Sequence, residues 1–237
     1  MHEVFGVNMI YPALLASARR FGSEKKEFEK CVHTLMSFCF RHMKIGRGTV
    51  STLTKHMVNV ANLINSGQSL TAVRNELAAQ SKDSEFIENF KEWTSYQAKL
   101  NFYVLWWLEE HLLSGSVPVE HGEYQNLEHI MPKVPTKKDW PIAYRLKQDD
   151  PERFKDLLWS IGNLLALPAD VNKSIKNQGI EEKIGGNKGK NYKSVSLKLP
   201  SEIGEYVSDK DEWDAECVNI RHEYIADNYV VKVWKLC

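Results

Sequence analysis

Apolar residues recur at helical spacing through most of the first half of the chain. Between Lys25 and Met43 they fall three and four residues apart, which is the stripe of an amphipathic helix. The same spacing predicts further helices, which begin near Pro12, Thr49 or Ser51, Ser69 and Glu85. The segment from Tyr96 to Leu113 is apolar around most of its circumference, as is usual at a bundle centre. The pattern therefore predicts a helical bundle over residues 1–115.

The pattern changes after a cluster of helix breakers at Ser114–Pro118, and we expect the domain boundary there, between residues 115 and 116. Two short apolar runs follow, Leu127–Met131 and Ile161–Leu167, and each has the length of a strand. The long stretch between them is expected to be functional or structured in its own right. The polar segment Ala169–Gln178 suits a helix, so the predicted order is strand, long connection, strand, helix.

The last sixty residues predict a loop and a closing helix. Residues 179–200 are rich in glycine and lysine, which is typical of a mobile loop. The segment Glu212–Trp234 has the spacing of a helix, although Tyr229–Val233 at its end is equally compatible with a strand. The fold class expected is α+β and mostly α: a helical bundle over residues 1–115, then a second domain over residues 116–237.

Composition narrows the class of protein. Hydrophobic residues make up 43% of the chain, which excludes wholesale disorder. Thirty-one basic residues balance thirty-one acidic ones, which excludes a histone-like electrostatic binder. No apolar run approaches the roughly 20 residues that span a bilayer, so we expect no membrane association. The four cysteines are scattered without a C-x-x-C pair, and a cytoplasmic location is expected.

One segment is locally basic. Residues 171–200 contain seven lysines against two acidic residues, Glu181 and Glu182. Lysines spaced along a glycine-rich segment can follow a phosphate backbone without reading bases. A solvated loop accounts for the same composition equally well. The candidate DNA-binding residues are Lys173, Lys176, Lys183, Lys188, Lys190 and Lys193.

Candidate chemistry begins at Glu128-His129, where Pro132 ends the first predicted strand and lets both side chains reach a cleft. Taken alone, a histidine beside a glutamate is more often a surface pair. Asn163 lies at the start of the second strand and Asn172 in the following helix, nine residues later. Each asparagine alone suits a cap or a turn. The four residues in this order, on strand, strand and helix, are much harder to obtain by accident.

The combination resembles the ββα-metal nucleases, also called HNH or His-Me finger nucleases. More narrowly, it is similar to the C-terminal nuclease domain of GmrSD-type restriction proteins and of the phosphorothioate-sensing SspE proteins. Leu127–Pro132 is similar to the family's EHI-x-P strand, and Trp159–Leu167 to its IGNLxLL run. Weaker similarities extend over most of the chain, at Asn172, Lys183, Tyr192 and Ser194, at Trp213, Ile220-Arg221 and Trp234, and at Tyr96–Leu113 and Phe38–Arg41.

The resemblance implies a role for each candidate residue. His129 would be the general base that takes a proton from the attacking water. Asn172 and Glu128 would bind one divalent ion, Glu128 directly or through water, and Asn163 would hold the loop or orient His129. Oxygen donors without cysteine suit Mg²⁺, or Mn²⁺ in vitro.

The function implied is a metal-dependent endonuclease that cleaves or nicks DNA in restriction of foreign DNA, whether phage DNA or modified DNA. One alternative is a catalytically inactive nuclease fold that binds DNA or a protein as a scaffold. Another is a nuclease directed at RNA, which would use the same site.

Partners follow from the same resemblance. The sequence contains neither the DGQQR signature of the nucleotide-processing domain in GmrSD-type proteins nor a P-loop. We therefore expect that domain or subunit to be absent from this chain. Double-strand cleavage needs two sites, so it requires either a homodimer or successive nicks.

Overall fold

The computed structural model describes residues 8–113, 126–186, 189–207 and 212–236. The chain divides into two compact units, one made of residues 1–93 and 226–237 and the other of residues 94–225. The boundary expected between residues 115 and 116 lies outside the described residues. The helix that precedes it belongs to the second unit.

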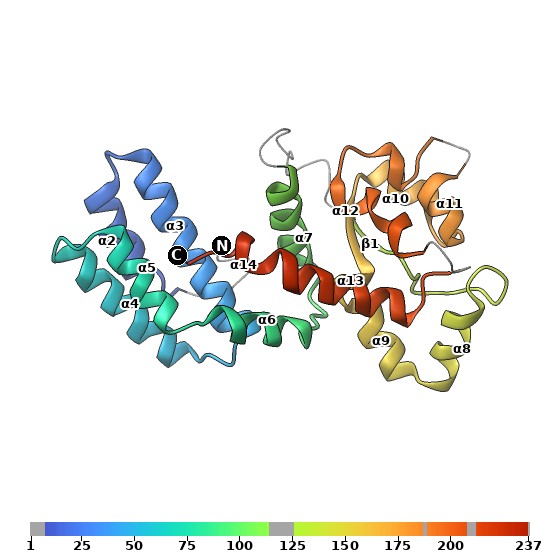
Figure 1. The fold of residues 1–237 in the computed structure, drawn as a ribbon, viewed down its shortest axis with the longest axis horizontal. Coiled ribbons are helices and arrows are strands. Elements are labelled where there is room, and N and C mark those ends of the chain that lie inside the picture. Colours follow the sequence, from blue (N-terminus) through green and yellow to red (C-terminus); the bar gives the residue numbers. More distant parts are fainter. Residues whose placement is uncertain (1–7, 114–125, 187–188, 208–211, 237) are drawn as a thin grey trace. The chain divides into compact units, whose positions relative to one another are not determined.

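The first unit consists of helices (Figure 1). Their buried faces are the apolar stripes of the sequence. Of the two candidate caps for the third helix, Thr49 is the N-cap, and it exchanges bonds with Thr52 in a capping box. The helices expected here are confirmed as α2 (Tyr11–Phe21), α3 (Lys25–Phe40), α4 (Val50–Asn65), α5 (Leu70–Ala79) and α6 (Asp83–Lys91).

The end of α3 departs from regular helix. It continues into a π-helical turn, η1 (Arg41–Ile45), before Gly46 ends it. An aromatic cluster lies near this turn: the rings of Phe40 and Trp234 are 4.4 Å apart. Phe86 packs edge-on against both rings and Phe90 packs against Trp234 at a tilt, so the C-terminal end of the chain completes the core of the first unit.

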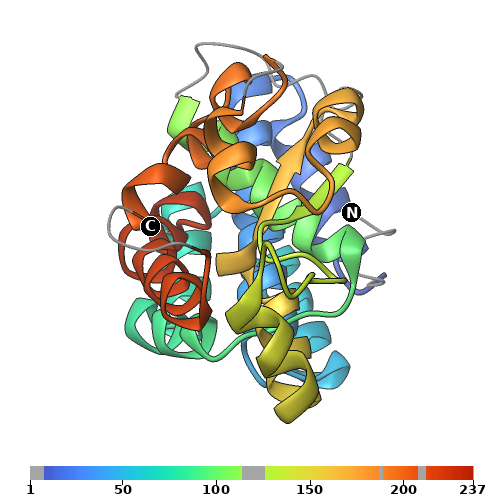
Figure 2. The same cartoon turned by 90° about the vertical axis from the view of Figure 1, so that its right-hand side faces the viewer.

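The second unit is built around a two-stranded antiparallel sheet, and the α+β, mostly α class is confirmed. Strand β1 (Asn126–His129) pairs with β2 (Leu164–Leu167), and His129 lies opposite Leu164. Helix α7 (Ala98–Leu113) packs on β2. Figure 2 shows both strands, with the helices of the connection between them at one end of the sheet.

That long connection is helical. It forms α8 (Pro141–Asp149) and α9 (Pro151–Trp159), and each has a proline at its first turn, where the missing N–H costs nothing. The second strand begins three residues later than its apolar run, because residues Ile161–Asn163 form a 3₁₀ turn, η2. The helix that follows, α10 (Ala169–Ile175), ends at Lys176, whose φ of 40° cannot continue a helix.

The prediction of a mobile loop over residues 179–200 is wrong for the residues of this segment that the structure describes. Buried side chains anchor this segment to the unit, among them Ile180, Tyr192 and Leu199. The segment forms α11 (Ile180–Gly185), η3 (Tyr192–Ser194) and α12 (Lys198–Ser201), and a further 3₁₀ turn follows, η4 (Ile203–Tyr206).

The closing segment is helical in two pieces, α13 (Ala215–Asn228) and α14 (Val230–Val233), so the strand alternative for its end is wrong. Tyr229 separates them, because its backbone leaves the helical region. Among the described residues, no helix combines the length and the apolar character of a bilayer span.

Candidate functional site

A pocket of about 470 Å³ opens at the end of β1 in the second unit. Three of the four predicted catalytic and metal-binding residues line it: Glu128, His129 and Asn172. The sheet pairing and the packing of α10 on β1 bring together residues that are 43 positions apart in the sequence. The rest of the wall comes from Asn126, Leu127, Pro132, Lys133, Lys173, Lys176 and Asn177.

His129 is held in a largely apolar setting, with 7% of its surface exposed. Its imidazole packs edge-on against the indole of Trp159, with ring centres 5.1 Å apart. Burial, reinforced by the positive charges of Lys133 and Lys183, lowers the pKa of His129 to about 3. The imidazole is therefore neutral at cellular pH, and its Nε2 atom is buried without a hydrogen-bond partner among the described residues.

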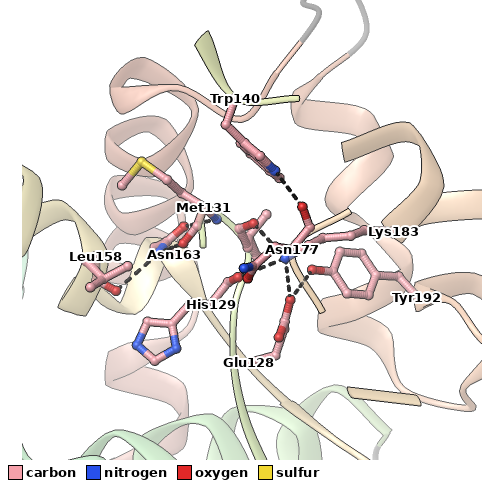
Figure 3. Close-up of polar contacts among 10 residues, drawn as sticks. Glu128, His129, Met131, Trp140, Leu158, Asn163, Asn177, Lys183 and Tyr192 are labelled. Carbon is pink, nitrogen blue, oxygen red and sulfur yellow. Dashed lines mark hydrogen bonds and ion pairs between the residues drawn. The ribbon is translucent and has the colours of Figure 1, made fainter. Parts of the chain in front are cut away.

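Glu128 faces the other side of the strand, as adjacent residues of a strand do. Its Oε1 atom accepts a hydrogen bond from Lys183 Nζ at 2.6 Å and one from the Tyr192 hydroxyl at 3.1 Å, whereas the His129 imidazole points away from this cluster (Figure 3). Burial raises the pKa of Glu128, and Lys183 and Tyr192 oppose that rise. The carboxylate and the imidazole thus lie in two different environments.

Asn163 is fully buried and makes three side-chain hydrogen bonds. Its Oδ1 accepts from the Met131 N–H at 2.8 Å, and its Nδ2 donates to the carbonyl oxygens of Met131 and Leu158 at 3.2 and 3.1 Å (Figure 3). These bonds hold the loop that follows His129. Asn163 does not line the pocket, and its effect on the imidazole stays a prediction.

Arg221 supports the same corner from α13, a role that sequence reasoning missed. Its buried guanidinium donates through Nη1 to the carbonyl oxygens of Ile161, Gly162 and Leu164. Gly162 lies so close to α13 that a Cβ there would be 2.0 Å from the Val218 carbonyl oxygen. Glycine is therefore required at this position by close approach of the helix.

The predicted DNA-binding lysines fall into different settings. Lys173 and Lys176 are exposed at the pocket wall, and Lys193 is exposed elsewhere. Lys190 is exposed and pairs with Asp170 at 3.1 Å, while Lys188 lies outside the described residues. Lys183 is a correction: none of its side chain is exposed, so it is unavailable to a DNA phosphate.

Two further features of the site escaped sequence reasoning. Lys133 lines the pocket, and its ammonium lies 5.2 Å from the centre of the Trp159 ring. The burial of Lys183 had a signal in the sequence, since Ile180, Lys183 and Ile184 fall on one face of a helix. No signal in the sequence pointed to Lys133, because charge and spacing do not distinguish it from other surface lysines.

The donor atoms at the pocket suit a hard cation that binds together with substrate. Among the described residues, no three His, Cys, Asp or Glu side chains are grouped to hold a metal by themselves. Oε1 of Glu128 is occupied by Lys183 and Tyr192, which leaves Oε2 of Glu128 and the amide oxygen of Asn172. Mg²⁺ typically uses one or two carboxylates, substrate phosphates and retained waters, so this donor set fits it.

Comparison with known families identifies the family of the chain. The family model of the C-terminal domain of GmrSD restriction endonucleases matches residues 80–228, more than half of the chain. The chain belongs to this family. Among curated proteins, none matches it. The GmrSD-type relationship expected from the sequence is confirmed, and membership supports a nuclease role in restriction. The match to the GmrSD C-terminal domain covers α6, β1, β2 and all the elements between them, and it ends with α13.

Proposed function

We propose that this protein is a metal-dependent endonuclease of the HNH type that nicks or cleaves DNA in restriction of foreign DNA. The observation that carries the proposal is the composition of the pocket. His129 lines the pocket together with an amide, a carboxylate and three lysines, and its neutral imidazole has an unpartnered, buried Nε2 atom. These are the groups that hydrolysis of a phosphodiester requires: a base, donors for a cation and positive charge for the phosphates.

His129 acts as the general base. A water molecule at Nε2 gives up its proton to the imidazole as its oxygen attacks the phosphorus, and the bond to the 3′ oxygen breaks. The low pKa of His129 keeps the ring neutral before DNA binds. A bound phosphate adds negative charge beside Lys133, which raises the basicity of the ring for the reaction. Nε2 has no accessible surface, so substrate binding must shift the pocket wall to admit the water.

Asn172 and Glu128 would hold one Mg²⁺ or Mn²⁺ ion, through the amide oxygen and through Oε2, directly or by way of water. When bound, the ion supplies positive charge to the phosphate and to the departing oxygen. Lys133, Lys173 and Lys176 attract the DNA backbone without reading its bases. Asn163 keeps the chain that carries His129 in place.

The direct test is a nicking assay. Supercoiled plasmid incubated with the protein and Mg²⁺ or Mn²⁺ should yield nicked circles, and EDTA should prevent this. His129→Ala should reduce the rate by at least ~100-fold while leaving the fold and DNA affinity nearly unchanged. His111→Ala, exposed on α7, is the control. Full activity of His129→Ala would refute the mechanism, and single-stranded RNA as a second substrate tests the RNA-directed alternative.

A catalytically inactive, DNA-binding nuclease fold is the second candidate. The burial of Nε2 and the engagement of Glu128 by Lys183 favour it, since both withdraw groups from solvent. It predicts DNA binding that depends on the pocket lysines, with no nicking by the wild-type protein under any divalent ion. The same assay therefore separates the two candidates.

A further inference from the structure

The ammonium of Lys183 is enclosed within the second unit, with none of its side chain exposed. It donates to three oxygens: Glu128 Oε1 at 2.6 Å, and the main-chain carbonyls of His129 and Ile130, both at 3.0 Å. An ammonium has three donors, so all of them are used. The Trp140 ring, 5.5 Å away, covers another side of the charge.

These bonds complete the restraint of the backbone that carries the imidazole. Lys183 holds the carbonyls of His129 and Ile130, while the Ile130 N–H donates to the Asn163 carbonyl at 2.9 Å. The next peptide group, at Met131, is held by the Asn163 side chain. Every polar main-chain group from the His129 carbonyl to the Met131 carbonyl is therefore bonded to a residue distant in the sequence. Such double anchoring fixes the direction of the Cα–Cβ bond of His129.

We infer that Lys183 is a positioning residue for His129, acting from α11 through the two carbonyls and Glu128, rather than a DNA-contacting lysine. The inference rests on the proposed function, in which His129 is the base. Its physical basis is that a displacement of about 1 Å at a catalytic group costs up to ~100-fold in rate. A phosphate contact is ruled out by burial, because the ammonium has no surface to offer.

The test compares Lys183→Met with Lys173→Met, an exposed lysine at the pocket wall, and with Lys55→Met, exposed on α4. For Lys183→Met we expect kcat for plasmid nicking to fall 10- to ~100-fold, with KM within about twofold of wild type. The salt dependence of DNA binding should keep its slope. Lys173→Met should instead reduce that slope by about 1, as loss of a phosphate contact does.

Two results would overturn the inference. One is a folded Lys183→Met protein with wild-type kcat, which would make the role purely structural. The other is a reduced salt slope, which would make Lys183 a phosphate contact after all. The ¹⁵N-correlated signals of the His129 imidazole give an activity-independent readout, and we expect Lys183→Met to shift them and Lys55→Met to leave them in place.

Lys183→Met leaves Glu128 buried without its cation, which is a recognised route to unfolding. If that variant does not fold, Lys183→Met is combined with Glu128→Gln, which removes the unpaired charge, and is compared with Glu128→Gln alone. The double variant should shift the His129 signals beyond those of Glu128→Gln, and identical signals in the two would refute the inference. If the wild-type protein does not nick DNA, the proposed function fails, while the imidazole signals still decide whether Lys183 positions His129.

Discussion

The side chain of Asn163 bonds both the N–H and the carbonyl oxygen of Met131, so a single amide closes a ring of hydrogen bonds around the residue two positions after His129. An amide can do this because it has a donor and an acceptor on one planar group. Neither a carboxylate nor an apolar side chain of the same size offers both.

Replacing Asn163 should therefore destabilise the second unit. Asn163→Ala leaves the Met131 N–H and two buried carbonyls without partners, and we expect a loss of about 2–4 kcal/mol in the free energy of unfolding. Urea denaturation followed by circular dichroism measures it. Asn62→Ala, exposed on α4, should change stability by less than ~0.5 kcal/mol. Equal stability of the two variants would contradict the stabilising role of the Asn163 hydrogen bonds.

Gly162 provides a steric prediction with a matched control. Gly162→Ala would place a Cβ 2.0 Å from the Val218 carbonyl oxygen, so α13 must move, and we expect a loss of about 1–3 kcal/mol. Gly185→Ala, at the last residue of α11, meets nothing within 4 Å and should be neutral or slightly stabilising, because alanine favours a helix. Thermal melting distinguishes the two, and a Gly162→Ala protein as stable as Gly185→Ala would show that α13 moves aside at little cost.

Lys176 holds a strained backbone beside the pocket, with φ 40°. Lys176→Gly should raise the free energy of unfolding by about 1 kcal/mol, since glycine adopts this conformation freely. The same variant should bind DNA more weakly, with a salt slope smaller by about 1. Lys176→Met separates the effects, because it removes the charge and keeps the strain: it should reproduce the weaker binding without the gain in stability.

Glu109 gives the protein a pH dependence. Its carboxylate is buried and accepts the N–H groups of Lys198 and Leu199, and burial raises its pKa from 4.5 to about 7. The folded state therefore binds a proton that the unfolded state has released between these values. Protonation of Glu109 stabilises the folded state fully below pH 4.5. As the pH rises toward 7 this contribution is lost, and the free energy of unfolding falls by about 3 kcal/mol in total.

Denaturant unfolding across pH 4.5–8 tests this. Glu109→Gln should flatten the stability profile in that range, whereas Glu110→Gln, on the same helix, should leave the wild-type slope. Parallel profiles for wild type and Glu109→Gln would mean that the carboxylate titrates normally in the folded protein.

Asn172 offers a test of the cation. Asn172→Ala should raise the Mn²⁺ concentration needed for half-maximal nicking by about tenfold or more, because the ion loses an amide oxygen. Asn177→Ala removes an exposed amide from the same pocket wall and keeps Asn172. An unchanged Mn²⁺ titration for Asn172→Ala would remove it from the ligand set.

The helices of the first half could be predicted because their stability depends on local periodicity. The stripe Leu53, Met57, Val60, Ala61 and Ile64 is the buried face of α4, and Thr49 caps it as its side chain predicts. The two strands were also readable from their apolar runs, although the turn at Ile161–Asn163 was not. The conformation of this turn depends on Arg221, about 60 residues later. A local sequence pattern cannot predict a partner so distant in the chain.

The segment after α10 was misread for a physical reason. Glycine and lysine are typical of solvated loops, and a buried lysine is rare because its charge must be compensated. Glu128 supplies that compensation from 55 positions earlier in the chain. The sequence therefore located Glu128, His129 and Asn172 at one pocket, but it did not reveal that Glu128 is already paired.

The sheet that carries His129 has two strands of four residues each. A ribbon this short is marginal in water without outside support. Hydrogen bonds from the side chains of Asn163, Lys183 and Arg221 make the hairpin rigid. These bonds form only when the surrounding helices are in place. The ββα segment by itself should therefore not be a transplantable enzyme module. Excised as a peptide, or grafted without α11 and α13, it would not keep its fold and so could not hold its site residues in place.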